Sequence, residues 1–263
     1  MTARHAFVVP AYGQSPYLDA CLASLAAQRR PSRIHVATST PYDGLDALCA
    51  RHGASLNVHA PNLGIGRDWN MALRQSDADW ITVAHQDDLY DPGFSESVMT
   101  LVAGSGDCGF AFTDAREVDE AGAVRGASMN QRVKRLLAGS AFLGRQQIRG
   151  SLARRILLGF GNPVSCPAVT INMRLHPDFV FREDLRTNMD WMAWVDLSRT
   201  AGIARIREKM MSHRVHGASE TARCLDDGAR RREDKMVFAE MWPRAISVPL
   251  QRLYALSYRG YLP

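Results

Sequence analysis

The chain has 263 residues, 46% of them hydrophobic, and a formal net charge of +5. These values predict one large globular domain, or one domain with an appendage, that has an anionic ligand or surface as its partner. No apolar run is as long as a membrane span and no signal peptide pattern is present, so we expect a cytoplasmic protein. The five cysteines are scattered without a CxxC pair, and nucleic-acid-binding motifs are absent, which argues against a disulfide framework, a zinc site and a nucleic-acid partner.

The first half of the chain alternates predicted strands and helices. Apolar runs predict strands at 6–9, 34–38, 55–59, 80–84 and 109–113, and helical spacing predicts helices at 16–28, 44–52, 68–76 and 94–103. This order is typical of a parallel sheet with helices on both faces. Ligands of such sheets bind outside the carboxyl ends of the strands, where Pro10, Ser39, Asn62 and Asp87 are expected to lie.

The second half is predicted with less regularity. Eight basic residues and no acidic ones occur between 125 and 155: Arg125, Arg132, Lys134, Arg135, Arg145, Arg149, Arg154 and Arg155. This segment is either a mobile cover over a site or an ordinary solvated surface. A strand at 168–173 and helices at 189–201 and 226–242 follow. Residues 246–261 are expected to dock on the domain, with a membrane surface as the alternative.

The sequence His-Gln-Asp-Asp at 85–88 follows the apolar run 80–84. Adjacent side chains of an extended chain point in opposite directions, so one carboxylate can face a divalent cation and the other a polar ligand. Magnesium is commonly held by one or two carboxylates together with substrate phosphates. The pair Asp87 and Asp88 therefore indicates a site for a nucleoside diphosphate with its metal. The alternative is an ordinary turn or helix cap.

Six segments between residues 5 and 221 together resemble the family 2 glycosyltransferases, which have the GT-A fold. They are residues 7–12, 37–41, 62–70, 85–88, 188–194 and 213–221. The resemblance implies an α/β fold with a mostly parallel, Rossmann-like central sheet, helices on both faces and a C-terminal helical extension. It implies a transferase domain at 1–225, with a nucleotide-binding half at about 1–115 and an acceptor-binding half at about 116–225, and the extension at 226–263.

The resemblance assigns the nucleotide base to the loop of Pro10, Ala11 and Tyr12, where the ring of Tyr12 offers a flat face. Thr38 and Ser39 stand where many family members carry an aspartate that bonds the base. They are expected to contact the base or ribose, or only to satisfy backbone groups of their own loop.

Asp68 belongs to the third segment. It is expected either to contact the nucleoside or to act as the N-cap of the helix that follows the loop at 61–66. Gly64 and Gly66 allow the backbone of that loop to approach a ligand closely.

The resemblance places Asp87 near the ribose and gives Asp88 the role of binding Mg²⁺ or Mn²⁺ at the diphosphate. His216 is expected to bind the metal or the diphosphate, and Arg214 to neutralise phosphate charge. His85 stands where many members have the first aspartate. We expect it to pack within the strand end, because Mg²⁺ strongly prefers oxygen.

Asp190 is the single acid of the segment that resembles the family's catalytic motif. A sugar transfer with inversion needs a base that takes the proton of the acceptor hydroxyl, and Asp190 is predicted to be that base. Its alternative role is the N-cap of a helix at 191–201. Glu183 and Asp184 are the second choice for the base.

Together these implications favour a metal-dependent, inverting transferase of a hexose or deoxyhexose. It would move the sugar from a nucleotide-sugar donor to a hydroxyl of a saccharide or lipid-linked saccharide, as in cell-surface polysaccharide synthesis. The basic segment and the C-terminal tail are further expected to make a peripheral contact with the inner face of the membrane.

Two alternatives remain at this stage. A non-catalytic nucleotide-sugar-binding module stays open, because the first aspartate is replaced at His85 and Asp190 has no acidic neighbour. A sugar nucleotidyltransferase is disfavoured, because residues 10–14 lack the Gly-rich, basic loop of that class.

Overall fold

The structure is a computed structural model that describes residues 3–126, 129–217 and 228–256. In this part of the chain nine strands form one sheet, in the order β3-β2-β1-β4-β8-β6-β9-β5, with β7 paired to β9. The strands are β1 (His5–Ala11), β2 (Arg33–Thr38), β3 (Ser55–Val58), β4 (Trp80–Val83), β5 (Leu89–Tyr90), β6 (Cys108–Val118), β7 (Gln147–Ile148), β8 (Val169–Asn172) and β9 (Gly202–Arg214). The helices are α1 (Leu18–Ala26), α2 (Leu45–Arg51), α3 (Ile65–Leu73), α4 (Phe94–Val102), α5 (Met129–Phe142), α6 (Ser151–Leu158), α7 (Met189–Thr200), α9 (Ala229–Met241) and α10 (Arg244–Leu256).

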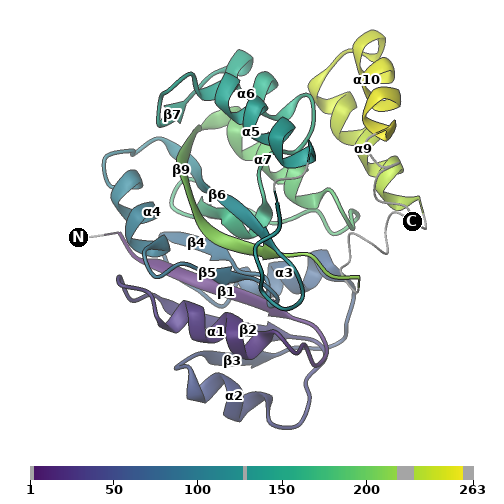
Figure 1. The fold of residues 1–263 in the computed structure, drawn as a ribbon. Helices are drawn as coiled ribbons and strands as arrows, with labels where there is room; N and C mark the ends of the chain where they lie inside the picture. Colours follow the sequence, from purple (N-terminus) through teal and green to yellow (C-terminus); the bar gives the residue numbers. More distant parts are fainter. Residues whose placement is uncertain (1–2, 127–128, 218–227, 257–263) are drawn as a thin grey trace.

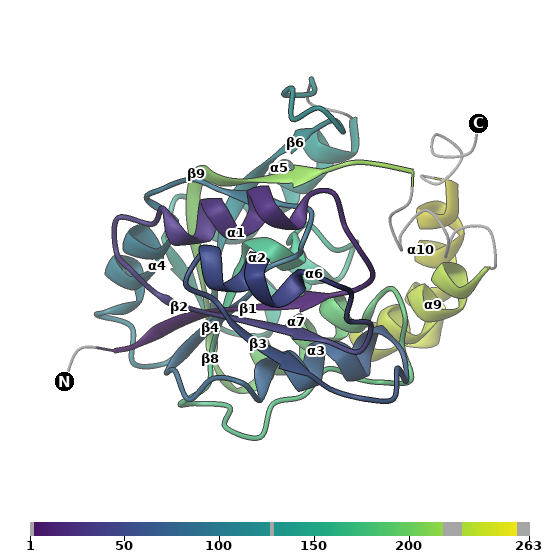
Figure 2. The same cartoon turned by 90° about the horizontal axis from the view of Figure 1, so that it is seen from below.

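Helices cover both faces of the sheet, as the sequence predicted (Figures 1 and 2). Strand β1 lies between β2 and β4 and supplies side chains to both faces, because neighbouring residues of a strand point in opposite directions. Ala6 and Val8 join an apolar cluster that includes residues of α3, α5, α6, α7 and α9. Phe7, Val9 and Ala11 join a second cluster with α1, α2 and α4. Strands buried on both faces therefore read as continuous apolar runs.

The first half of the sheet is parallel, as expected, but the second half contains antiparallel pairs. Strands β3, β2, β1 and β4 pair in parallel. Strand β8 runs antiparallel to both β4 and β6, and β9 runs parallel to β6. Because β8 is antiparallel to both of its neighbours, β6 and β9 run in the same direction as β4. The carboxyl ends of β4, β6 and β9 consequently lie at the same edge of the sheet.

Strand β9 was not predicted, and β6 is longer than the predicted strand at 109–113. In the middle of β9, the run Arg207-Glu208-Lys209 is exposed and charged, so the strand has no continuous apolar pattern. The pairing of β6 with β9 continues to Val118 and Arg214 through register shifts near Asp114. Such bulges bend a strand, and Figure 1 shows β9 curving over the sheet.

Two predicted helix caps are wrong. Helix α3 begins at Ile65 with Gly64 as its N-cap, so Asp68 lies inside the first turn and not at the cap. Helix α7 begins at Met189 with Asn188 as its N-cap, so Asp190 is the second residue of the helix. Both aspartates are therefore held on helices and not in loops.

The C-terminal helices α9 and α10 pack together beside α7 (Figure 1). The ring of Tyr254 on α10 lies 5.8 Å from that of Trp191 and 5.4 Å from that of Phe238. The expected docking of the chain from residue 246 is thus confirmed as far as Leu256. Residues 257–263 of the predicted tail and residues 218–227, with Ser219 and Thr221 of the sixth segment, lie outside the described residues. Among the helices described, none has the length and apolarity that crossing a bilayer requires.

Candidate functional site

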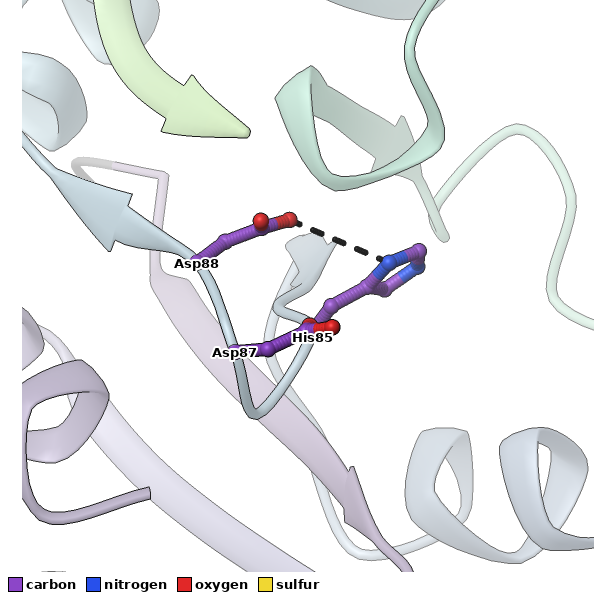
Figure 3. Close-up of side chains that lie close together, drawn as sticks. All are labelled: His85, Asp87 and Asp88. Carbon is purple, nitrogen blue, oxygen red and sulfur yellow. Dashed lines mark ion pairs between the residues drawn. The ribbon is translucent and has the colours of Figure 1, made fainter. Parts of the chain in front are cut away.

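Two carboxylates and an imidazole lie together in the turn after β4. The ligand atoms of His85, Asp87 and Asp88 are all within 4.8 Å of one another. The backbone N–H of Asp88 donates to the carbonyl of His85 at 3.2 Å, which closes the turn. Figure 3 shows the side chains of Asp88 and His85 pointing toward each other, with Nδ1 of His85 3.9 Å from Oδ2 of Asp88. His85 also packs on the ring of Trp69, at 4.9 Å between centroids, so it combines the expected packing with a place in the cluster.

The end of β9 holds Asp88 in place. The backbone N–H of Arg214 donates to Oδ1 of Asp88 at 2.8 Å, and Nδ1 of His213 is 3.2 Å from the same oxygen. The side chain of Asp88 is 0% exposed, and a buried carboxylate is stable only with such partners. Burial lowers the pKa of His213, but Asp88 and Asp87 together raise it by more, so the net pKa is raised. The end of β9 and the acidic turn therefore stabilise each other through this contact.

Asp87 is paired with His216, as its Oδ2 lies 2.8 Å from Nε2 of that histidine. Burial tends to raise the pKa of Asp87, but the neighbouring histidines, His85 first, lower it by more. The guanidinium of Arg214 donates to the carbonyl of Asp87 at 2.9 Å and to two further carbonyls. It is occupied in joining this turn to β9, which differs from its expected role of facing a phosphate.

Asp190, on α7, is within electrostatic range of His85 in the acidic turn. Its Oδ2 accepts a hydrogen bond from Nδ2 of Asn162 at 3.0 Å, and its Oδ1 accepts one from the N–H of Trp191 at 2.6 Å. Burial raises the pKa of Asp190, and Arg230 opposes that rise in part. Burial raises the pKa of the Cys166 thiol, and Asp190 and Asp88 both add to the effect. Asp190 and Asp88 therefore both act electrostatically on Cys166, and Asp190 also acts on His85 of the acidic turn.

The loop after β1 is joined to the acidic turn through Gln86. Its side chain accepts a hydrogen bond from the N–H of Tyr12 at 3.0 Å and donates one to the carbonyl of Tyr12 at 3.2 Å. Tyr12 is 56% exposed and therefore accessible to a planar ligand. Pro10 and Ala11 form the end of β1, where Ala11 is buried.

Thr38 and Ser39 make different hydrogen bonds in the structure. Thr38 is buried and its Oγ1 accepts a hydrogen bond from the N–H of Thr40 at 3.0 Å, which matches the alternative that it satisfies its own loop. Ser39 donates from Oγ to Oδ2 of Asp68 at 2.9 Å. The other oxygen of Asp68 is 3.8 Å from Nε2 of His59. Asp68 is thus a buried carboxylate directed at the loop after β2.

The second-choice acids are engaged away from the acidic turn. Glu183 accepts a hydrogen bond from Nδ2 of Asn70 at 3.1 Å. Asp184 is exposed and forms an ion pair with Arg182, whose guanidinium lowers the pKa of that carboxylate. A general base works best with a pKa raised toward the operating pH, and burial raises the pKa of Asp190.

The donor set of the acidic turn fits a divalent cation. It offers carboxylate oxygens of Asp87 and Asp88, the ligands that Mg²⁺ and Mn²⁺ prefer. Nδ1 of His85 faces Asp88 at 3.9 Å, and the other ring nitrogen, Nε2, is buried without a hydrogen-bond partner among the described residues.

Four site residues were not predicted from the sequence: His213, Gln86, Asn162 and Lys134. His213 precedes Arg214 in the segment 213–221, so its place in that segment could have marked it as a site residue. Lys134 on α5 lies within electrostatic range of Asp190 and Glu117, although burial, the larger effect, lowers its pKa. Asn162 and Gln86 act through single side-chain contacts, and no pattern in the sequence marks such residues.

Comparisons with known proteins identify the family and the fold. The family model described as Glycosyl transferase family 2 matches residues 6–149. No curated protein matches the sequence. TarS from S. aureus, residues 1–349 in complex with UDP-GlcNAc, is similar in structure, with a TM-score of 0.68 and 15% identity over 98% of this chain and 73% of that chain.

Two further solved structures are similar. The mannosyltransferase PcManGT from Pyrobaculum calidifontis, in complex with GDP-Man and Mn²⁺, has a TM-score of 0.66 and 14% identity over 98% of this chain and 70% of that chain. A mycobacterial protein has a TM-score of 0.59 and 14% identity over 88% of this chain and 73% of that chain. At these identities the likeness establishes the fold.

Proposed function

This chain belongs to glycosyl transferase family 2, and from that premise we propose that it is a metal-dependent, inverting transferase of a sugar from a nucleotide-sugar donor to a hydroxyl group. Its GT-A fold, expected from the sequence, is shared with the glycosyltransferases TarS and PcManGT. The observation that carries the proposal is a half-buried Asp190 that interacts electrostatically with His85 of the acidic turn.

The donor lies over that edge in the proposal, with the base against Tyr12 and the diphosphate toward Asp88. A divalent cation held by Asp87 and Asp88, with His85 beside it, would supply charge that offsets the departing diphosphate. The contact with His216 at 2.8 Å keeps the Asp87 side chain oriented. Ser39 and Asp68 form the polar end of the nucleoside site.

Asp190 acts as the general base. Its carboxylate takes the proton of the acceptor hydroxyl while the oxygen forms a bond to the anomeric carbon on the face opposite the diphosphate. The bond between that carbon and the diphosphate oxygen breaks, and its electron pair leaves with the nucleoside diphosphate. One displacement inverts the anomeric configuration. The raised pKa of Asp190 makes it a stronger base once it is deprotonated.

The acceptor is proposed to be a saccharide or a lipid-linked saccharide. Leu136, Leu143 and Leu152 are 69–78% exposed on and beside α5 and α6, within the segment that has eight basic and no acidic residues. Exposed leucines among arginines suit the interface of an anionic membrane. Sedimentation with anionic and neutral vesicles tests this part of the proposal. The absence of binding to anionic vesicles would remove it.

The test of the function is a thermal-shift screen of nucleoside diphosphates, beginning with UDP and GDP, with and without Mn²⁺. A ligand that binds only the folded state raises the melting temperature. We expect a metal-dependent rise with one base, and then turnover of the corresponding nucleotide-sugar. NMR of the product must show an inverted anomeric configuration. A retained configuration, or the absence of any shift, would contradict the proposal. Binding without turnover across donors would favour the non-catalytic module.

A further inference from the structure

The buried carboxylate of Glu233 on α9 accepts hydrogen bonds from residues 186–188, which precede α7. The Oε1 atom of Glu233 accepts a hydrogen bond from the N–H of Arg186 at 2.8 Å. Its Oε2 accepts hydrogen bonds from the N–H of Thr187 at 2.8 Å, the hydroxyl of Thr187 at 3.0 Å and the N–H of Asn188 at 2.9 Å. Three successive backbone N–H groups thus converge on one side chain, the arrangement in which peptide groups bind an anion.

The next residue of α9 makes a second contact with the same segment. Oδ1 of Asp234 accepts a hydrogen bond from Nδ2 of Asn188 at 2.8 Å, and Asn188 is fully buried. Asn188 is the N-cap of α7 but its side chain makes no capping hydrogen bond to that helix. The side chains of α9 therefore define where α7 begins.

Asp190 follows this segment by two residues. Trp191, next to it, packs edge-on against Phe238 of α9 at 5.2 Å between ring centroids. A shift of α9 relative to residues 186–188 would move the start of α7 and the Asp190 carboxylate with it. Figure 1 shows α9 lying beside α7 at this end of the molecule.

We propose that Glu233 is a positioning residue for the catalytic base: it fixes residues 186–188, and through them the Asp190 carboxylate, in the geometry that the sugar transfer needs. The proposal rests on the transferase function proposed above. It gives the C-terminal helix pair a share in the chemistry, although neither helix supplies the base. A buried carboxylate with four hydrogen bonds is rigid, because every loss of a donor leaves a charge unsatisfied.

Glu233→Gln tests the proposal at nearly constant volume. One carboxylate oxygen becomes an amide NH₂ group, which cannot accept hydrogen bonds from the N–H groups that face it. The matched control is Glu240→Gln. Glu240 also joins α9 to α7, through Arg199 at 2.6 Å, but this pair is exposed and lies at the other end of α7.

We expect Glu233→Gln to lower kcat by up to about 100-fold, the scale of a small misplacement of a catalytic group. Mn²⁺-dependent binding of the nucleoside diphosphate should stay unchanged in the same variant. The acidic limb of the kcat profile should move to lower pH, because a loosened Asp190 is better hydrated and its raised pKa falls. Glu240→Gln should retain the wild-type kcat and profile.

Several outcomes separate this inference from the function beneath it. A folded Glu233→Gln protein with wild-type kcat and pH profile would overturn the positioning role and leave the transferase function intact. Equal losses in both variants, with the profile unmoved, would mean that α9 only stabilises the fold, which also overturns the role. A wild-type chain without turnover on any donor would remove the function and this inference together. If Glu233→Gln does not fold, Asp234→Asn takes its place, because it weakens the contact of α9 with Asn188, together with the ion pair between Asp234 and Arg230.

Discussion

The backbone N–H of Arg214 donates a hydrogen bond to the Asp88 carboxylate at 2.8 Å, although 126 positions separate the two residues in the sequence. This contact joins the end of β9 to the turn after β4. It satisfies one oxygen of a fully buried acid and directs the acid toward His85. The donor site of the transferase is thus built from two distant segments, and its parts can be tested separately.

Replacing Asp88 with asparagine should abolish the metal-dependent part of nucleotide binding. Asparagine keeps the shape and one oxygen for the N–H of Arg214, so the fold should survive. The charge that attracts the cation is lost, and we expect turnover to fall on the order of 100-fold or more, as when one electrostatic stabiliser of a transition state is removed. The Mn²⁺-dependent thermal shift measures binding. An undiminished shift would show that the cation is held elsewhere.

Asp190→Asn should reduce kcat by about 10²–10⁴-fold, the usual contribution of a general base, while donor binding is retained. The same change should raise the melting temperature at neutral pH. The pKa of Asp190 is raised by burial, so its charged form destabilises the folded state above that pKa and the penalty vanishes as pH falls below the ordinary value for an aspartate. Melting curves at neutral and acidic pH check the sign. A lower melting temperature of the variant at neutral pH would contradict this assignment of the burial effect.

The exposed ring of Tyr12 should contribute to binding through its face. Tyr12→Ala is expected to weaken nucleoside diphosphate binding by about 1–3 kcal/mol, the range for stacking of one base on an aromatic side chain. Tyr12→Phe keeps the face and should bind as the wild type does. Isothermal titration of both variants compares them. Equal affinities in all three proteins would place the base away from this loop.

His5 should make the fold sensitive to acid. Burial, assisted by Arg30, lowers its pKa from 6.5 to about 3, and its ring nitrogens contact the hydroxyls of Ser32 at 2.8 Å and Thr82 at 2.9 Å. A depressed pKa leaves the stability intact above about 6.5 and removes it progressively as pH falls toward about 3. Between pH 7 and 5 this amounts to about 2 kcal/mol. Urea unfolding of His5→Gln should lack this part of the pH dependence, and an equal loss in both proteins would assign it to other groups.

The parallel half of the sheet was accessible from the sequence because its strands are continuous apolar runs between loops. Phe7-Val8-Val9 and the run 80–84 are buried on both faces, so nothing competes with their pattern. The acidic turn was accessible for the same reason, since Asp87 and Asp88 directly follow such a run. Placing them at the carboxyl edge required only the direction of the strands.

Strand β9 and the two helix caps could not be predicted from the sequence, for different reasons. The charged middle of β9 is solvated, and only its pairing with β6 makes it a strand. Asp68 and Asp190 have the residue type that usually caps a helix, but Gly64 and Asn188 precede them and the helices start earlier. The partners of Asn188 lie on α9, about 45 residues along the chain, and local propensity carries no information about contacts at that distance.

The large sequence separation between the turn after β4 and the end of β9 also affects the order in which the protein folds. Contacts between distant segments form late, because the chain between them must first be ordered. During synthesis, a chain that has emerged only as far as α7 already contains every residue of the first four strands, yet Asp88 still lacks the N–H of Arg214. The ability to hold a donor would therefore appear near the end of folding.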